Sequence, residues 1–188
     1  MRKLIAEIAV SLDGFIEGPD GELDWMLVEK DEDYLKTIKN RFDTIFYGRV
    51  SYERFGIAQP DEPFLSDQEK QLNDFIAKIR KYVFSYTAKH LPGNGMLVNE
   101  NIETVVKRIK DEEGKDILLF GGPDILKTFI DLGLVDEYIL ALHPRILGAG
   151  KPLFRGITNQ LSLKLLQTRR LKSGVVILHY RPNQDNSA

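Results

Sequence analysis

Apolar and polar residues along this chain follow two patterns that alternate with each other. Short apolar runs closed by turn residues predict buried strands, whereas apolar residues spaced three and four apart predict amphipathic helices. Residues 4–12 are apolar with one charge, and Asp13-Gly14 closes the run as a turn, which predicts a first strand. Within residues 31–42 the apolar side chains follow helical spacing behind a cluster of acids, which predicts a first helix.

The same alternation continues through most of the chain. Further strands are expected at residues 43–47, 82–84, 96–98, 116–120 and 138–142, and further helices at residues 50–55, 72–79, 102–109 and 123–132. Two final runs, residues 161–168 and 175–180, flank Lys172-Ser173-Gly174, which is a hairpin signal. We therefore predict a three-layer α/β/α fold with a mostly parallel central sheet and an antiparallel C-terminal edge hairpin. No linker or repeat divides the chain, so one domain is expected over residues 1–182, followed by a polar tail at 183–188.

Composition and charge narrow the classes of function. The chain has 188 residues, 43% hydrophobic and 29% charged, which is typical of a globular protein. Lys and Arg (26) nearly balance Asp and Glu (28), so no global field favours DNA or RNA. The lack of cysteine excludes disulfides, thiolate metal sites and a cysteine nucleophile, and three histidines make a His-rich metal site unexpected.

The sequence also predicts where the protein works. No apolar stretch approaches the roughly 20 residues that a membrane-spanning helix needs. Residues 1–6 resemble the start of a signal peptide, but Glu7 breaks the apolar run and no convincing cleavage site follows. We expect a cytoplasmic protein that binds neither membranes nor nucleic acid.

In parallel α/β sheets ligands bind beyond the carboxyl ends of the strands, so the turns after strands are the places to search. The turn after residues 43–47 contains Gly48, Arg49 and Ser51. Free backbone N–H groups at a helix start attract an anion, and Arg49 can grip a phosphate with two hydrogen bonds. A turn glycine, a solvated arginine and an N-cap serine would give the same sequence, so both interpretations stay open at this point.

Two further turns carry signals of the same kind, a sharper one at Gly121-Gly122 and a weaker one at Ser85. Gly121-Gly122 follows a buried strand, where glycines let the backbone approach a ligand or simply permit a positive φ. The full GxGxxG dinucleotide fingerprint is absent. Ser85 opens a hydroxyl-rich loop that could hold a ribose phosphate or be an ordinary loop. Together the three turns supply what a phosphorylated dinucleotide requires.

The candidate substrate side is less defined. Asp13 adds an acid and a loop that could cover a substrate, and Trp25 in that loop is as compatible with a core anchor as with a substrate wall. The acids Asp31, Glu32 and Asp33 are explained better by the dipole at a helix start, where acids are ordinary, than by a catalytic role. His143, His90 and His179 are interpreted as strand-end, surface or edge residues.

Five motifs occur in one order along the chain: Val10-Ser11-Leu12-Asp13-Gly14-Phe15-Ile16, Gly48-Arg49-Val50-Ser51-Tyr52-Glu53, Phe120-Gly121-Gly122, Leu134-Val135-Asp136-Glu137 and, after Pro144, Leu147-Gly148-Ala149-Gly150-Lys151-Pro152-Leu153-Phe154. In this order they resemble the dihydrofolate-reductase-like superfamily. The likeness is greatest to the branch formed by the C-terminal reductase domain of the bifunctional riboflavin-biosynthesis deaminase-reductase. It extends over about residues 4–180.

The resemblance implies an NADPH-dependent reductase that delivers hydride to an electrophilic carbon, often a C=N carbon, of a heterocyclic small-molecule substrate. Trp25 falls in the segment corresponding to the family's mobile lid and is the candidate substrate contact. The cofactor positions it implies are Gly48, Arg49, Ser51 and Ser85 for the adenosine side, Gly121, Gly122, Ile125 and Leu126 for the pyrophosphate and nicotinamide path, and Ala9 and Ile16 for the carboxamide.

Two questions stay open from the sequence. A proton donor could be Glu32 or Asp33, which match the acid on the first helix of folate reductases, or Asp13, which suits the riboflavin-type branch better. The favoured function is reduction resembling that of 5-amino-6-(5-phosphoribosylamino)uracil; dihydrofolate reduction and non-catalytic nucleotide binding are the alternatives. A homodimer is expected on family resemblance.

Overall fold

The computed structural model describes residues 1–27, 32–58 and 67–183, without the side chains of residues 32–35 and 67–69. Backbone contacts divide the chain into two compact units. The first contains residues 1–2 and the described part of 30–122, and the second contains the described parts of 3–29 and 123–188. The single domain expected over residues 1–182 stays a prediction, and the tail lies outside the described residues from position 184 onward.

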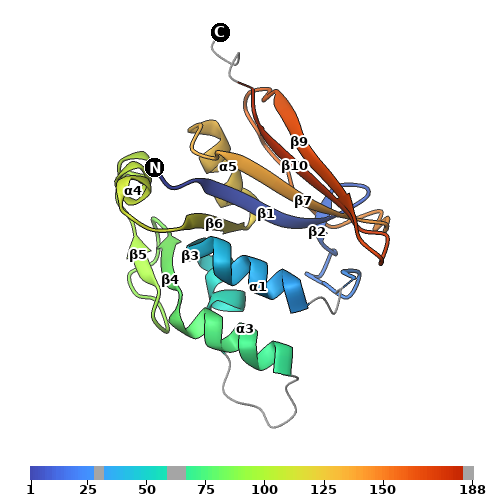
Figure 1. The fold of residues 1–188 in the computed structure, drawn as a ribbon. Coiled ribbons are helices and arrows are strands. Elements are labelled where there is room, and N and C mark those ends of the chain that lie inside the picture. Colours follow the sequence, from blue (N-terminus) through green and yellow to red (C-terminus); the bar gives the residue numbers. More distant parts are fainter. Residues whose placement is uncertain (28–31, 59–66, 184–188) are drawn as a thin grey trace. The chain divides into compact units, whose positions relative to one another are not determined.

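The first unit is a parallel sheet with its helices (Figure 1). Its strands pair in the order β5-β4-β3-β6, all parallel. The elements are α1 (Glu32–Arg41), β3 (Phe42–Gly48), α2 (Arg49–Ser51), the π-helix η1 (Tyr52–Gly56), α3 (Asp67–Lys78), β4 (Arg80–Phe84), β5 (Met96–Val98), α4 (Ile102–Asp111) and β6 (Asp116–Gly121).

The second unit combines one parallel pair with an antiparallel hairpin. Its strands pair in the order β1-β7-β10-β9, with β1 parallel to β7 and the others antiparallel, and β2 and β8 form a separate antiparallel pair. Figure 1 shows the long β9–β10 hairpin in orange and red. The elements are β1 (Leu4–Ser11), β2 (Phe15–Glu17), α5 (Pro123–Asp131), β7 (Glu137–His143), β8 (Lys151–Pro152), β9 (Leu163–Arg170) and β10 (Val176–Pro182).

Local chemistry explains where several helices begin and end. The side chain of Asn101 caps α4 by accepting a 3.0 Å hydrogen bond from the backbone N–H of Thr104. Helix α5 begins at Pro123, whose missing N–H costs nothing in a first turn, and it ends before Gly133, which adopts φ +63°. Both helices bury one apolar face, as their apolar spacing predicts.

The expected fold class is confirmed: the protein has an α/β fold with mostly parallel strands and an antiparallel C-terminal hairpin. The predicted strands and helices lie within a few residues of those observed. Strands β2 and β8 were not predicted, since they are three and two residues long.

Candidate functional site

Three turns lie at one edge of the sheet in the first unit. Strand β3 is parallel to both of its neighbours, β4 and β6. Gly48 is in register with Phe84, and Tyr47 is in register with Gly121, so the three strands end at the same level. The turn that follows each strand therefore emerges at the same edge. The structure brings together the three turns that the sequence singled out.

Arg49 is the cation at this edge. Its Nη1 donates to both carboxylate oxygens of Glu53, at 2.9 and 2.8 Å. The two side chains are 42% and 39% exposed, and an ion pair in that much water contributes little to stability. A phosphate carries more charge than a carboxylate and presents more acceptor oxygens, so it can compete with Glu53 for the guanidinium.

The hydroxyl of Ser51 ties the first turn to the second. Its Oγ accepts a 3.1 Å hydrogen bond from the backbone N–H of Gly122, and its own O–H can still donate to an anion. A Cβ on Gly122 would lie 3.3 Å from this oxygen. Gly121 adopts φ +103°, and no described atom lies within 4 Å of where its Cβ would be. Gly121 is buried but leaves open space where a side chain would lie, whereas Gly122 is half-buried and lies close to Ser51.

Ser85 organises the third turn. Its Oγ accepts from the backbone N–H of Ala88 at 3.1 Å and lies 3.5 Å from the hydroxyl of Thr87. Its backbone N–H donates to Val98 at 3.0 Å. The neighbouring Tyr86 is 72% exposed and offers an aromatic face. Ser85 therefore shapes the loop, and its hydroxyl remains at the edge where a phosphate would bind.

An aromatic face near this edge was expected at Tyr86, whereas the exposed ring of Phe120 was not singled out from the sequence. Phe120 is 38% exposed, and its ring centroid lies 5.1 Å from that of Tyr47 and 5.6 Å from that of Phe55. It provides a flat apolar surface directly before the Gly121-Gly122 turn. The signal that could have found it is its place, as the apolar residue before a glycine pair.

The tyrosine of the Gly-Arg-x-Ser-Tyr-Glu motif is a buried anchor. The hydroxyl of Tyr52 donates to the carbonyl of Pro92 at 2.6 Å and accepts from the N–H of Gly95 at 2.7 Å. A Cβ on Gly95 would meet the Tyr52 ring at 2.7 Å, and one on Gly56 would meet it at 2.4 Å. Tyr52 thus holds the loop that leads into β5 and contributes to the site through backbone position alone.

In the second unit, Asp13 lies in the turn after β1 and is surrounded by donors. Its carboxylate accepts from the hydroxyl of Ser11 at 2.7 Å and from the backbone N–H groups of Leu147 and Gly148 at 3.1 and 2.8 Å. The Ser11 hydroxyl and these amides lower the pKa of Asp13, although partial desolvation acts in the opposite sense. This geometry favours the carboxylate form and an anchoring role.

The late glycine-rich motif packs against the same turn. Gly150 adopts φ +146°, and a Cβ there would come within 2.2 Å of the backbone oxygen of Glu17. The N–H of Leu153 donates to the carbonyl of Gly14 at 2.9 Å. The spacing of this motif is therefore explained by close backbone contact between β2 and β8.

Trp25 is a buried side chain in this structure. It is 7% exposed, its Nε1 donates to the carbonyl of Glu22 at 3.2 Å, and its ring lies edge-on to His143 with centroids 5.3 Å apart. Of the two roles that the sequence left open, core anchor and substrate wall, these contacts favour the first. His143, which the sequence analysis had set aside as strand-end structure, is its main ring partner.

The remaining predicted residues are placed as follows. Ala9 lies in β1, in register with Ala141, and Ile16 lies in β2. Ile125 and Leu126 are on the buried face of α5, so their side chains pack in the core of the second unit. Glu32 and Asp33 are in the first turn of α1, with side chains outside the described part of the structure.

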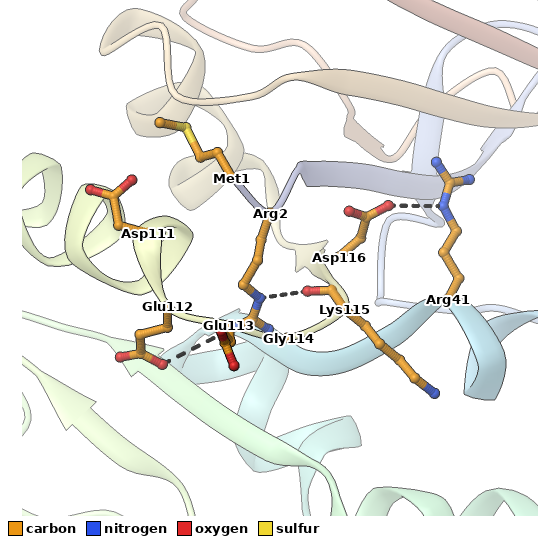
Figure 2. Close-up of a pocket in the computed structure, with 9 residues that line it drawn as sticks. All are labelled: Met1, Arg2, Arg41, Asp111, Glu112, Glu113, Gly114, Lys115 and Asp116. Atoms are coloured by element: carbon orange, nitrogen blue, oxygen red, sulfur yellow. Dashed lines mark hydrogen bonds and ion pairs between the residues drawn. The ribbon is translucent and has the colours of Figure 1, made fainter.

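A cavity of about 640 Å³ lies elsewhere in the first unit (Figure 2). Arg41 precedes β3 and Asp116 begins β6, so this cavity is at the amino ends of the strands, whereas the three turns follow their carboxyl ends. Buried Arg2 pairs with Asp43, and Arg41 pairs with Asp116. The two lining arginines are thus paired within the unit, and these pairs connect the strand starts.

Two kinds of feature are absent from the described residues. No group of three or more His, Asp or Glu side chains there could hold a metal ion. Every helix in the described part of the chain is too short or too polar to cross a lipid bilayer.

Comparison with known proteins now defines the class. The family model of the RibD C-terminal domain matches residues 2–177. This chain belongs to the RibD C-terminal domain family. The uncharacterized protein YyaP of Bacillus subtilis (strain 168) is 42% identical over 184 residues, which are 97% of this chain and 96% of YyaP.

Solved structures share the fold at low sequence identity. A deaminase/5-amino-6-(5-phosphoribosylamino)uracil reductase from Thermotoga maritima matches with a TM-score of 0.70 and 16% identity, over 97% of this chain and 57% of that one. Dihydrofolate reductase from Enterococcus faecalis, complexed with NADP(H), matches with a TM-score of 0.66 and 17% identity, over 97% of both chains. The fold is therefore that of RibD reductase domains and dihydrofolate reductases, as the motifs had indicated.

Proposed function

We propose that this protein is an NADPH-dependent reductase that transfers hydride to a heterocyclic or C=N-type small-molecule substrate. The observation that carries the proposal is the edge of the first unit, where Arg49, the Ser51 hydroxyl and the Gly121-Gly122 turn lie together. Family membership supports it. The two solved structures with the same fold that are described above are both named as reductases.

The residues at this edge fit the phosphates of a dinucleotide. Arg49 offers a guanidinium whose present partner is an exposed carboxylate, and Ser51 keeps an O–H free to donate. The open space beside Gly121 lets a phosphate approach the backbone where a side chain would obstruct it. Charge, donors and room are therefore present in one place.

Bound NADPH would supply the hydride, and the chain would supply binding and orientation. Arg49 would hold the 2′-phosphate with charge-assisted hydrogen bonds, and Ser51 and Ser85 would donate to the adenosine-side phosphates. The ring of Phe120 would offer an apolar surface to the cofactor next to the Gly121-Gly122 turn. Ala9 and Ile16, assigned to the carboxamide by resemblance, stay predictions for the second unit.

A proton donor is needed only where the reduced atom becomes basic. The donors around Asp13 favour its carboxylate form, so we assign it the task of holding the turn after β1 rather than of giving up a proton. Glu32 and Asp33 are then the sequence's remaining candidates. Comparing the pH profiles of Glu32→Gln and Asp33→Asn would separate them, since only the donor's variant loses the fall in rate that occurs as the pH rises through the donor's pKa.

Thermal unfolding with NADPH and with NADH tests the cofactor assignment. A ligand at a hundredfold excess over its Kd stabilises the folded state by about 2.7 kcal/mol, or several degrees in Tm. We expect a larger shift with NADPH than with NADH. Arg49→Ala should weaken NADPH binding roughly tenfold or more and NADH binding much less, because the guanidinium contacts the extra phosphate.

Arg108→Ala, on the exposed face of α4, removes the same charge and should change neither affinity. Equal losses for the two cofactors in Arg49→Ala would overturn the role of Arg49. Screening pterins, pyrimidines and dihydrofolate for NADPH oxidation then tests catalysis. Binding without turnover across the panel would instead support a nucleotide-binding protein, and tight antifolate binding would support dihydrofolate reduction.

A further inference from the structure

His143 ends β7 and is 5% exposed, in register with Ser11 of β1. Its Nδ1 accepts a 3.1 Å hydrogen bond from the backbone N–H of Leu27. The face of its ring meets the edge of Trp25, with the two ring planes at 84°. One imidazole therefore contacts both Trp25 and the chain two residues later.

The stretch of chain that His143 contacts has no helix or strand. We call residues 22–27 the Trp25 segment. Within it, Trp25 donates to the carbonyl of Glu22, and the N–H of Met26 donates to the carbonyl of Leu23 at 3.1 Å. These bonds fold the segment on itself, whereas its contacts with Nδ1 and with the ring join it to β7.

The Leu27 hydrogen bond depends on the protonation state of His143. An imidazole nitrogen accepts a hydrogen bond only when it carries no proton, so Nδ1 is bare and the ring's proton sits on Nε2. The imidazolium form has two donors and no acceptor. Protonation would bring two N–H groups face to face and place a charge in a buried position beside the indole.

We propose that neutral His143 is the residue that positions the Trp25 segment, and that protonation of Nδ1 releases the segment from β7. Burial lowers the pKa of His143, so the ring is neutral at neutral pH and becomes charged only in more acidic solution. The hydrogen bond from Leu27 to His143 is therefore formed at neutral pH.

No ionic partner competes for the imidazole in the described structure. Burial is the single cause of its pKa shift, so neighbouring charges do not contribute resolvably to it. The titratable groups on the elements around it are Asp13 after β1, Glu22 and Asp24 on the Trp25 segment, Arg145 after β7 and Lys172 in the β9–β10 turn. Asp13 is engaged with Ser11 and with the amides of Leu147 and Gly148.

Release of the Trp25 segment would also affect the reaction. This second part rests on the proposed reductase function and on the family resemblance, which implies that the segment containing Trp25 corresponds to the mobile lid. Releasing the segment would weaken substrate binding, so KM should rise toward acidic pH while kcat changes less. The release itself requires no cofactor or substrate and is tested without them.

Trp25 is the only tryptophan, so its fluorescence reports on this segment alone. Emission and acrylamide quenching should be recorded on the ligand-free protein from about pH 8 to about pH 5. We expect a red shift and a rise in quenching of about twofold or more as the indole leaves its buried position. The midpoint should lie below about 6.5, the ordinary imidazole value.

Variants identify the titrating group. His143→Gln keeps an oxygen that can accept from Leu27 and has no imidazole, so the transition should vanish. The double variant His90→Gln/His179→Gln leaves His143 as the only histidine, and there the transition should persist with the midpoint of the remaining imidazole NMR signal. That variant keeps the test valid if His143→Gln does not fold.

Three results would overturn the proposal. The transition could survive in His143→Gln, or the emission could stay constant while circular dichroism shows the protein still folded. Intensity could also fall without a red shift or added acrylamide access, which would mean that the imidazolium quenches the indole in place. A failure to bind NADPH would leave all three measurements unaffected, so the two proposals fail separately.

Discussion

The carboxylate of Asp13 accepts a 2.8 Å hydrogen bond from the backbone N–H of Gly148, 135 residues further along the chain. Two motifs that are far apart in sequence, the early Ser-Leu-Asp-Gly and the late Leu-Gly-Ala-Gly-Lys-Pro, are therefore one structure in the second unit. Backbone bonds reinforce it, since the N–H of Leu12 donates to the carbonyl of Arg145 at 2.7 Å. This close contact between the two motifs explains why both contain small or turn-forming residues.

Replacing Asp13 should loosen this structure. Asp13→Asn removes the charge that the Ser11 hydroxyl and the two amides stabilise, so Tm at neutral pH should fall by several degrees. Because the folded pKa is lowered, this contribution is complete above the ordinary value of 3.8 and is lost as the pH falls through the folded pKa. The difference in Tm between the variant and the parent should therefore shrink in acid, while Asp20→Asn, at an exposed turn, should leave Tm unchanged at both pH values.

Gly150 and Gly148 form a matched pair for testing close backbone approach. Gly150→Ala would place a Cβ 2.2 Å from the oxygen of Glu17, and Gly148→Ala would meet nothing within 4 Å. Both glycines have positive φ, so both variants carry backbone strain of about 1 kcal/mol or more. We expect Gly150→Ala to lose roughly 2–3 kcal/mol more in urea unfolding, from overpacking. Equal losses would show that the β2–β8 contact yields easily.

The buried hydroxyl of Tyr52 should be worth more than its size suggests. Tyr52→Phe leaves the Gly95 N–H and the Pro92 carbonyl without their partner. Because Pro92 is exposed and Gly95 is half-buried, water can replace part of the lost bonding, so urea unfolding should show a loss of about 1 kcal/mol. Tyr86→Phe removes a hydroxyl from a side chain that is 72% exposed and should change stability by less than about 0.5 kcal/mol.

Lys81 is a buried cation in the middle of β4. It is 1% exposed, and its Nζ donates to the Asn94 side chain at 2.6 Å. Burial lowers its pKa, so the unfolded chain holds the proton more tightly, and stability rises with pH between the folded value and the ordinary 10.5.

Lys81→Met should remove that alkaline rise and match or exceed the parent's stability at neutral pH, because an exposed Asn94 can turn to water. Urea midpoints at neutral and alkaline pH measure both effects. Lys89→Met, at an exposed position, should keep the parent's pH slope. A clear loss of stability in Lys81→Met at neutral pH would instead show that the Asn94 bond outweighs the cost of burying the charge.

The sequence predicted the regular elements well, because periodicity reports local burial. The run at residues 117–120 is fully apolar, and residues 117–119 are buried in β6, which pairs with β3, as such a run implies. The three turns could be grouped from the sequence because parallel strands end at one edge. The Ser51–Gly122 hydrogen bond and the exposed ring of Phe120 required the structure, since neither follows from spacing.

The second unit was harder to predict. Its short strands, β2 and β8, exist because residues 15–17 meet residues 151–152, and no local pattern announces a contact over that separation. The roles of Asp13 and His143 depend on backbone N–H groups contributed by Gly148 and Leu27. A hydrogen bond from a backbone N–H group cannot be recognised from residue types. The sequence therefore indicated only that Asp13 is an acid and that His143 ends a strand.

The pairing of β1 with β7 also determines when the second unit can form during synthesis. The N–H of Leu4 donates to the carboxylate of Asp136, 132 residues later, and β1 finds its parallel partner only when β7 has been made. At about 5–20 residues per second, synthesis of that interval takes on the order of 10 s. During that time the edge of β1 that pairs with β7 lacks its partner, so a nascent chain stalled before residue 137 should bind chaperones more than the complete chain.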